Sequence, residues 1–130
     1  MEKTAVEKEK GGKVMTREEI RGRALFFMGA EEGDAAEYAP HLDALIETGY
    51  GNLCLAAGKE WPENGGDGQT LDLPLWAQEA VAEYAASRML QNGGADRRER
   101  AGILYARYMQ ASSRLLMREG KRVKFIHLYD

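Results

Sequence analysis

The sequence has little of several residues on which whole classes of protein depend. Its single cysteine, Cys54, excludes an internal disulfide and leaves no second thiol for a zinc cluster. Its two histidines, His41 and His127, lie far apart and lack the spacing of a helical metal site. No run approaches the roughly 18 apolar residues needed to cross a bilayer, and residues 1–10 alternate charges where a signal peptide is apolar. We therefore expect a protein of a reducing cytosol, with no membrane partner.

Patterns typical of catalysis and ligand binding are missing too. Cys54 stands between two leucines, which is typical of a buried, inert cysteine. Residues 65–68, Gly-Gly-Asp-Gly, lack both the lysine of a phosphate-binding loop and the regular acidic spacing of a calcium loop. The neighbouring carboxylates, such as those of Glu79 and Glu83, are simpler to interpret as a solvated face. We expect no catalytic residues, no cofactor and no metal, and hence no enzyme.

What the sequence does have is an uneven distribution of charge. The net charge is −3, but residues 16–95 hold 5 basic and 14 acidic side chains, whereas residues 96–124 hold 9 basic and 3 acidic. Such a division can orient neighbouring copies of a chain or attract nucleic acid, and it can also be no more than a solvated helix face. The composition, with 44% hydrophobic and 30% charged residues, is that of a folded globular domain.

The first predicted helix has clear signals at both ends. Thr16 and Glu19 form a capping box, and Gly29 supplies a left-handed terminator after Met28. The stripe expected in the core comprises Ile20, Ala24, Phe27 and Met28. Residues 1–15 hold seven charges and a Gly-Gly pair and are expected to form a mobile leader, with Met15 a candidate natural start.

The second predicted helix carries conflicting signals. Asp34 is a candidate cap, and the apolar residues that repeat with helical spacing are Tyr38, Leu42, Leu45 and Ile46. Pro40 favours a start nearer His41 or a short turn before it. The helix can extend through Leu53 and Leu55, but the glycines at 49 and 51 weaken that extension, and the alternative is a kink or break near Tyr50. Residues 58–70 are rich in glycine and predict a long loop, in which Trp61 either anchors the loop on the core or docks a partner.

Two further helices are expected to form an antiparallel hairpin. The third starts around Pro74 and runs to about Leu90, and its predicted inner stripe is Trp76, Ala77, Ala80, Val81, Tyr84, Ala85 and Arg88. Asp96 is the expected cap of the fourth, which runs to about Glu119 with an inner side of Ala101, Leu104, Tyr105, Tyr108, Ala111, Ser112, Leu115 and Leu116. The short connection between them, Asn-Gly-Gly, brings them side by side.

The end of the chain differs in composition from the rest. Residues 121–129 are rich in β-branched and aromatic side chains and have no helix cap, which predicts an extended segment. A single strand needs an edge to pair with, on this chain or on another subunit, and the alternative is a tail lying across its own bundle. The fold class we predict is mainly α: a small bundle of about four helices over residues 16–120, an antiparallel C-terminal hairpin, and an extended docking tail over residues 121–130.

A local pattern connects this layout with a known family. Leu73, Pro74, Trp76 and Ala77 open a helix that continues to Tyr84-Ala85, after an acidic helix-rich start and before a helix rich in tyrosine and arginine. Over residues 16–119 this order resembles the head-tail connector, or adaptor, proteins of tailed bacteriophages and prophages. The long Trp61 loop departs from the shorter connections of that family.

The resemblance implies a structural protein of the virion neck, assembled in the cytoplasm of the bacterial host. In that family a small helical bundle forms a ring beneath the portal of the DNA-filled head, and the tail or a stopper protein assembles on the ring. The implied partners are therefore the portal protein, a tail or stopper protein, and other copies of the chain.

The residues we expect at the partner contact lie in the tail. Apolar contacts are assigned to Val123, Phe125, Ile126, Leu128 and Tyr129, and orientation by opposite charge to Arg122 and Lys124. The alternative is a small intracellular helical regulator that binds protein or nucleic acid. Sequence-specific DNA recognition is disfavoured, because the arginines are dispersed along one helix and the isoelectric point is about 5.5.

Overall fold

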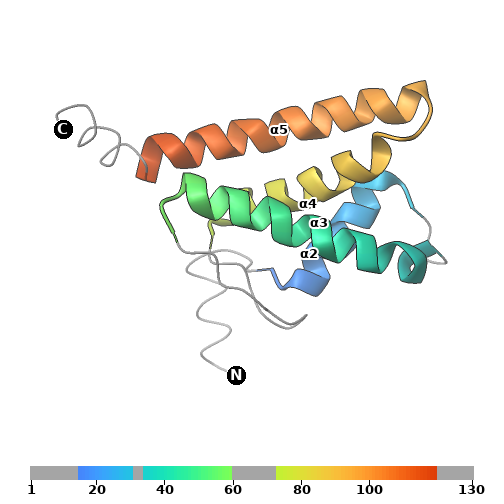
Figure 1. The fold of residues 1–130 in the computed structure, drawn as a ribbon, viewed down its shortest axis with the longest axis horizontal. Helices are drawn as coiled ribbons and strands as arrows, with labels where there is room; N and C mark the ends of the chain where they lie inside the picture. Colours follow the sequence, from blue (N-terminus) through green and yellow to red (C-terminus); the bar gives the residue numbers. More distant parts are fainter. Residues whose placement is uncertain (1–14, 31–33, 60–72, 120–130) are drawn as a thin grey trace.

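The computed structural model describes residues 15–30, 34–59 and 73–119, and these form a small bundle of helices. Four α-helices occur in this part of the chain: α2 (Arg17–Met28), α3 (Ala35–Ala56), α4 (Leu75–Leu90) and α5 (Ala95–Glu119). Figure 1 shows α5 running antiparallel to α4 along the upper edge, with α3 in front. The predicted helical bundle and its C-terminal hairpin are thereby confirmed.

Helix α2 is built as its end signals predict. The Glu19 N–H donates to the Thr16 hydroxyl at 3.1 Å, and the Thr16 N–H donates to the Glu19 carboxylate at 3.0 Å. Gly29 ends the helix with a φ of 70°, a conformation that glycine adopts without strain. Met15 is buried, and its N–H donates to the Gln78 side-chain oxygen at 2.8 Å, so the packed structure includes this last residue of the expected leader. The rest of that segment lies outside the described residues.

Helix α3 corrects the expectations drawn from its proline. The helix starts at Ala35, ahead of Pro40, and Asp34 occupies the N-cap position without a side-chain capping bond. Proline at this position removes one backbone hydrogen bond, the one that would reach the carbonyl of Ala36. Both residues are exposed, so water can hydrate that carbonyl, and the cost is small enough for the packing of the following turns to offset.

Of the two alternatives for the end of this helix, the extension through Leu53 and Leu55 is confirmed and the break near Tyr50 is wrong, because α3 runs unbroken to Ala56. The packing explains the first glycine: a Cβ added at Gly49 would lie 2.7 Å from the Cδ2 atom of Tyr84 on α4. The Gly49 carbonyl in turn accepts a hydrogen bond from the Tyr108 hydroxyl of α5 at 3.0 Å. The absence of a side chain at Gly49 therefore allows α3 to approach α4 closely, with Tyr50 completely buried beside it, and this packing offsets the low helix propensity of glycine.

Helix α4 is buried on nearly every side, not along one stripe. Pro74 is its N-cap and not its first helical residue. Residues from all round the helix are buried, namely Ala77, Gln78, Ala80, Val81, Ala82, Glu83, Tyr84, Ala85, Ala86, Ser87 and Leu90. Arg88, which we expected on the inner stripe, is exposed. The reason is tertiary: α2, α3 and α5 all pack against α4, so it is the centre of the bundle.

Helix α5 is covered on one side only. Its buried residues follow the alternating spacing of three and four of a helix-packing seam, and they are Ala101, Leu104, Tyr108, Ala111 and Leu115. Tyr105 and Leu116, expected on the inner side, are exposed. Asp96 lies within the first turn and is not the cap, since the helix begins at Ala95.

Replacing Gly49 by alanine tests the contact between α3 and α4. The new methyl group would overlap the ring of Tyr84, so we expect Gly49→Ala to lower the free energy of unfolding by about 1–3 kcal/mol, as overpacking does elsewhere. Gly22→Ala is the matched control, because Gly22 is exposed in α2 with nothing within 4 Å of the added atom. The control should raise stability by up to about 1 kcal/mol. Urea unfolding of both variants measures the difference, and a stabilising Gly49→Ala would contradict the packing described.

Candidate interaction surface on helix α5

The side of α5 that faces α3 and α4 is held by a tyrosine cluster. The rings of Tyr84 and Tyr108 lie 4.6 Å apart between centroids, and Tyr105 lies 6.1 Å from Tyr108 and 6.4 Å from Tyr84. Burial raises the pKa of Tyr108 to about 12, against a smaller opposite effect of the hydrogen bond to Asn52. The Tyr108 hydroxyl is therefore protonated at neutral pH and available to donate to Gly49.

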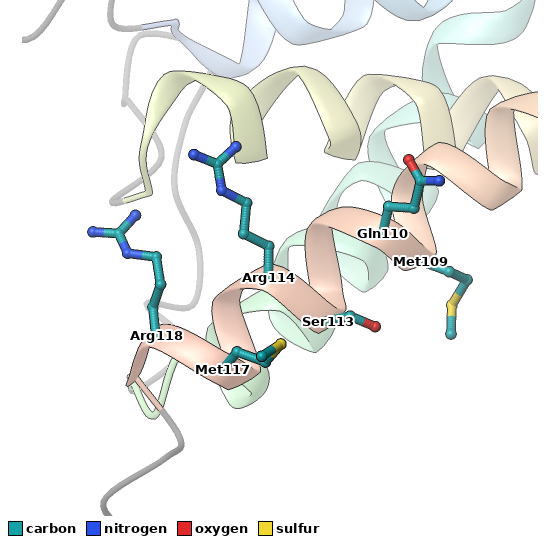
Figure 2. Close-up of a pocket in the computed structure, with 6 residues that line it drawn as sticks. All are labelled: Met109, Gln110, Ser113, Arg114, Met117 and Arg118. Carbon is teal, nitrogen blue, oxygen red and sulfur yellow. The ribbon is translucent and has the colours of Figure 1, made fainter.

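On the other flank of α5, arginine side chains contact side chains of α4. Arg107 pairs with Glu83 at 3.3 Å, and burial raises the pKa of Glu83 although Arg107 partly offsets the rise. The Arg114 guanidinium lies 4.0 Å from the centre of the Trp76 ring, and that of Arg118 lies 6.0 Å from it. Figure 2 shows Arg114 and Arg118 extending toward the start of α4. These side chains add contacts between α5 and α4 at the surface of the bundle.

The side turned away from α3 and α4 is apolar although it is exposed. We call it the outer face of α5. Its large apolar residues are Ile103, Met109, Leu116 and Met117, with the partly exposed Tyr105 at its edge, where it borders the tyrosine cluster. Their exposed fractions run from 40% to 73%, which amounts to about 500 Å² if a large side chain offers about 200 Å². Large exposed apolar patches often mark binding sites, and most of this area lies in the C-terminal half of α5, at Met109, Leu116 and Met117.

A shallow hollow of about 590 Å³ lies on the outer face, toward the end of the helix. Its lining, drawn in Figure 2, is Met109, Gln110, Ser113, Arg114, Met117 and Arg118. The lining includes two methionine side chains, and methionine adapts its shape readily to an apolar partner. The hollow is suited to an apolar side chain from another protein segment, with positive charge on one margin.

The site residues predicted from the sequence are not tested by this surface. The tail residues from Arg122 to Tyr129, and Trp61 in the loop, lie outside the described residues. His41 is exposed and Cys54 is buried on the same helix. They are thirteen positions, and hence roughly 20 Å, apart along its axis, so they do not come together as a nucleophile and base. Within the described ranges no group of three or more histidine, cysteine or acidic residues could hold a metal ion. No helix in those ranges is long and apolar enough to span a membrane.

The sequence reasoning missed the outer face because it assigned too many residues to the inner side. The signal was present in the spacing: Ala101, Leu104, Tyr108, Ala111 and Leu115 already complete a seam. A helix that packs on one side needs only the residues of such a seam to fill the core, so further apolar residues on that helix are left exposed. Met109 and Met117 are the clearest examples of such exposed apolar residues.

The fold and surface together define a small helical bundle with an exposed apolar face on its last described helix. Comparisons with protein-family models, with curated protein sequences and with solved structures found no match to this chain. The relationship to connector proteins therefore stays a prediction that rests on the resemblance over residues 16–119.

The tyrosine cluster generates a prediction about pH. Since the pKa of Tyr108 is higher in the folded state than its ordinary value of 10, folding favours the neutral phenol. Its contribution to stability is complete below pH 10 and is lost as the pH rises toward 12. Tyr108→Phe should cost about 1–2 kcal/mol at pH 7 through the lost hydrogen bond to Gly49. The gap between wild type and variant should narrow from pH 10 to 12, as measured by urea unfolding at each pH; a constant gap would contradict this assignment.

The pair between Arg107 and Glu83 generates a second prediction. Arg107→Met would leave a buried carboxylate without its counter-charge and should lower stability at pH 7 by about 1 kcal/mol, a modest figure because the arginine side chain is 58% exposed. The loss should shrink as the pH falls and Glu83 becomes protonated, since its folded-state pKa is raised. Arg98→Met, at an exposed position, is the control and should change stability by no more than about 0.5 kcal/mol. Thermal unfolding at pH 4 and pH 7 makes the comparison.

Proposed function

We propose that this chain is a structural assembly protein of a tailed phage or prophage particle, which forms a ring at the portal and joins the DNA-filled head to the tail. Its work in this proposal is non-enzymatic and consists of contacts between surfaces. The observation that supports it best is the apolar outer face of α5, which remains exposed in the single chain. The family resemblance of residues 16–119 supplies the identity of the partners.

The distribution of charge in the fold also supports assembly through contacts between copies. Among the described side chains, those of α5 include six arginines and two acidic residues. The described residues outside α5 include five basic and eight acidic residues. The basic excess therefore lies on one helix at one side of the bundle (Figure 1). Surfaces of opposite charge on one molecule favour contacts between neighbouring copies in a fixed orientation.

The tail completes the proposal. Val123, Phe125, Ile126, Leu128 and Tyr129 would provide apolar contacts to the portal or to a neighbouring copy, with Arg122 and Lys124 setting the orientation. An extended segment can add to an exposed sheet edge of another protein, where backbone hydrogen bonds give affinity and alternate side chains give specificity. The proposed location is the virion neck, reached after assembly in the host cytoplasm.

One observation favours the rival function, a small regulator that binds protein or nucleic acid. Three arginines, Arg97, Arg98 and Arg100, are exposed together in the first turns of α5. A nucleic-acid complex would weaken steeply with salt, because bound phosphates release counterions. A contact dominated by the apolar outer face would change little between low and moderate salt, so the salt dependence of partner binding separates the two functions.

The decisive experiment is electron microscopy after the protein is mixed with its cognate portal. We expect an added collar of density at the portal and a complex that survives moderate salt. A deletion of residues 121–130 should abolish or strongly reduce the collar, with circular dichroism confirming that the helices remain. If the deletion leaves both portal binding and ring formation unchanged, the tail is not the docking segment. If wild type adds no collar, the connector function is wrong.

A further inference from the structure

Helix α2 carries an exposed face whose chemistry complements the outer face of α5. Glu18, Gly22 and Phe26 follow one another at intervals of four residues, so they lie in line on one side of the helix. All three are exposed, and the Phe26 ring is 69% exposed. This line, which we call the outer face of α2, therefore offers one large apolar side chain, a glycine beside it and an acidic residue at its far end.

Phe26 is held in place in the single chain. Its ring packs edge-on against Phe27 at 6.0 Å, and the Arg23 guanidinium lies 5.3 Å from its centre. Arg23 is anchored in turn by its ion pair with Glu79 of α4. An exposed aromatic ring that is already ordered loses little conformational entropy when it enters a partner, which is what an interface anchor needs. Gly22, with nothing within 4 Å of an added Cβ, leaves room for close approach beside it.

The two faces lie on different sides of the bundle. Helices α2 and α5 both pack against α4, and Figure 1 shows α5 above α4 and α2 below it. The outer face of α2 therefore cannot meet the outer face of α5 in the same chain. It can meet that of another copy, and a contact between two different faces is head-to-tail, which generates closed rings when the rotation between copies allows it.

We propose that the hollow on the outer face of α5 receives Phe26 of a second copy of this chain, with α2 of that copy antiparallel to α5. This inference rests on the proposed ring and names the contact that would build it. Gly22 lies opposite Ser113, and Phe26, one turn further along α2, packs beside Met109 at one end of the hollow. The antiparallel direction carries Glu18 toward Arg118, so that the acidic end of one face meets the basic end of the other.

Charge favours this occupant over a symmetric pairing of two α5 helices. Two outer faces of α5 would bring like charges together at Arg114 and Arg118, whereas α2 supplies a carboxylate. The apolar area on α5, about 500 Å², is below the roughly 800 Å² that each partner contributes to a standard interface. A single contact is therefore weak, and the ring gains because every copy makes it twice.

Cysteine crosslinking tests the contact without altering its anchors. Gly22→Cys and Ser113→Cys are prepared separately and mixed, with a short bifunctional maleimide, at high concentration and again on the cognate portal. The mixture should give a crosslinked dimer that neither variant gives alone, and a chain with both cysteines should give a ladder of larger products. Wild type is the background control, because Cys54 is buried. The proposal would be overturned if each single variant alone gave as much crosslinked dimer as the mixture. It would also be overturned if the mixture gave no crosslinked dimer under either condition.

Substitution of the anchors gives an independent measure. Phe26→Ala and Met109→Ala should each weaken self-association about tenfold or more, whereas Leu55→Ala, on an α3 side chain that is 75% exposed outside both faces, should change it less than twofold. Equal effects of all three would show a general loss of apolar surface and overturn the assignment. The variants also separate the two proposals. If a collar forms on the portal without the mixed crosslink, the connector function is retained and this interface is rejected. If the chain with both cysteines gives a ladder but does not bind the portal, this interface is retained and the connector function is rejected.

Discussion

The close approach of α3 to α4 at Gly49 is the contact on which the arrangement of the other helices depends. Without a side chain at Gly49, the ring of Tyr84 lies directly against the backbone of α3, and the Gly49 carbonyl is left to accept the hydroxyl of Tyr108. One residue therefore connects three helices. The connection also fixes which side of α5 turns inward, and so which side is left outside.

The exposure of the α5 outer face follows from the central position of α4. A helix surrounded by three others can be buried on nearly every side, but each surrounding helix then has only one side in the core. Helix α2 uses part of its remaining surface for ion pairs, through Arg17 with Glu47, Arg21 with Asp43 and Arg23 with Glu79. Helix α5 instead presents large apolar residues, and that difference makes it the better candidate for a partner surface.

The proposed contact and the proposed tail would divide the work of assembly between two parts of the chain. A head-to-tail contact through α2 and α5 uses rigid, preorganised surfaces and would set the geometry between copies. An extended tail would supply attachment to a partner. Because a contact of this size is weak alone, assembly would depend on many copies gathered at one place, and a portal ring is such a place.

The sequence by itself determined the helices and their ends where the signals were local. The capping box at Thr16 and the terminator at Gly29 depend on residues within a few positions of one another, so they can be recognised without a structure. The hairpin of α4 and α5 was predictable for the same reason, since a connection of four residues, 91–94, leaves few arrangements.

Only the tertiary structure decided what those helices do with their surfaces. Pro40 and Gly49 read as interruptions in the sequence, yet α3 continues through both, because packing with α4 outweighs a propensity cost of about 1 kcal/mol per glycine. The burial of Glu83 and the exposure of Tyr105 likewise depend on which helices lie beside them. Periodicity finds an apolar side of a helix, but whether neighbours cover that side depends on contacts between residues far apart in the chain.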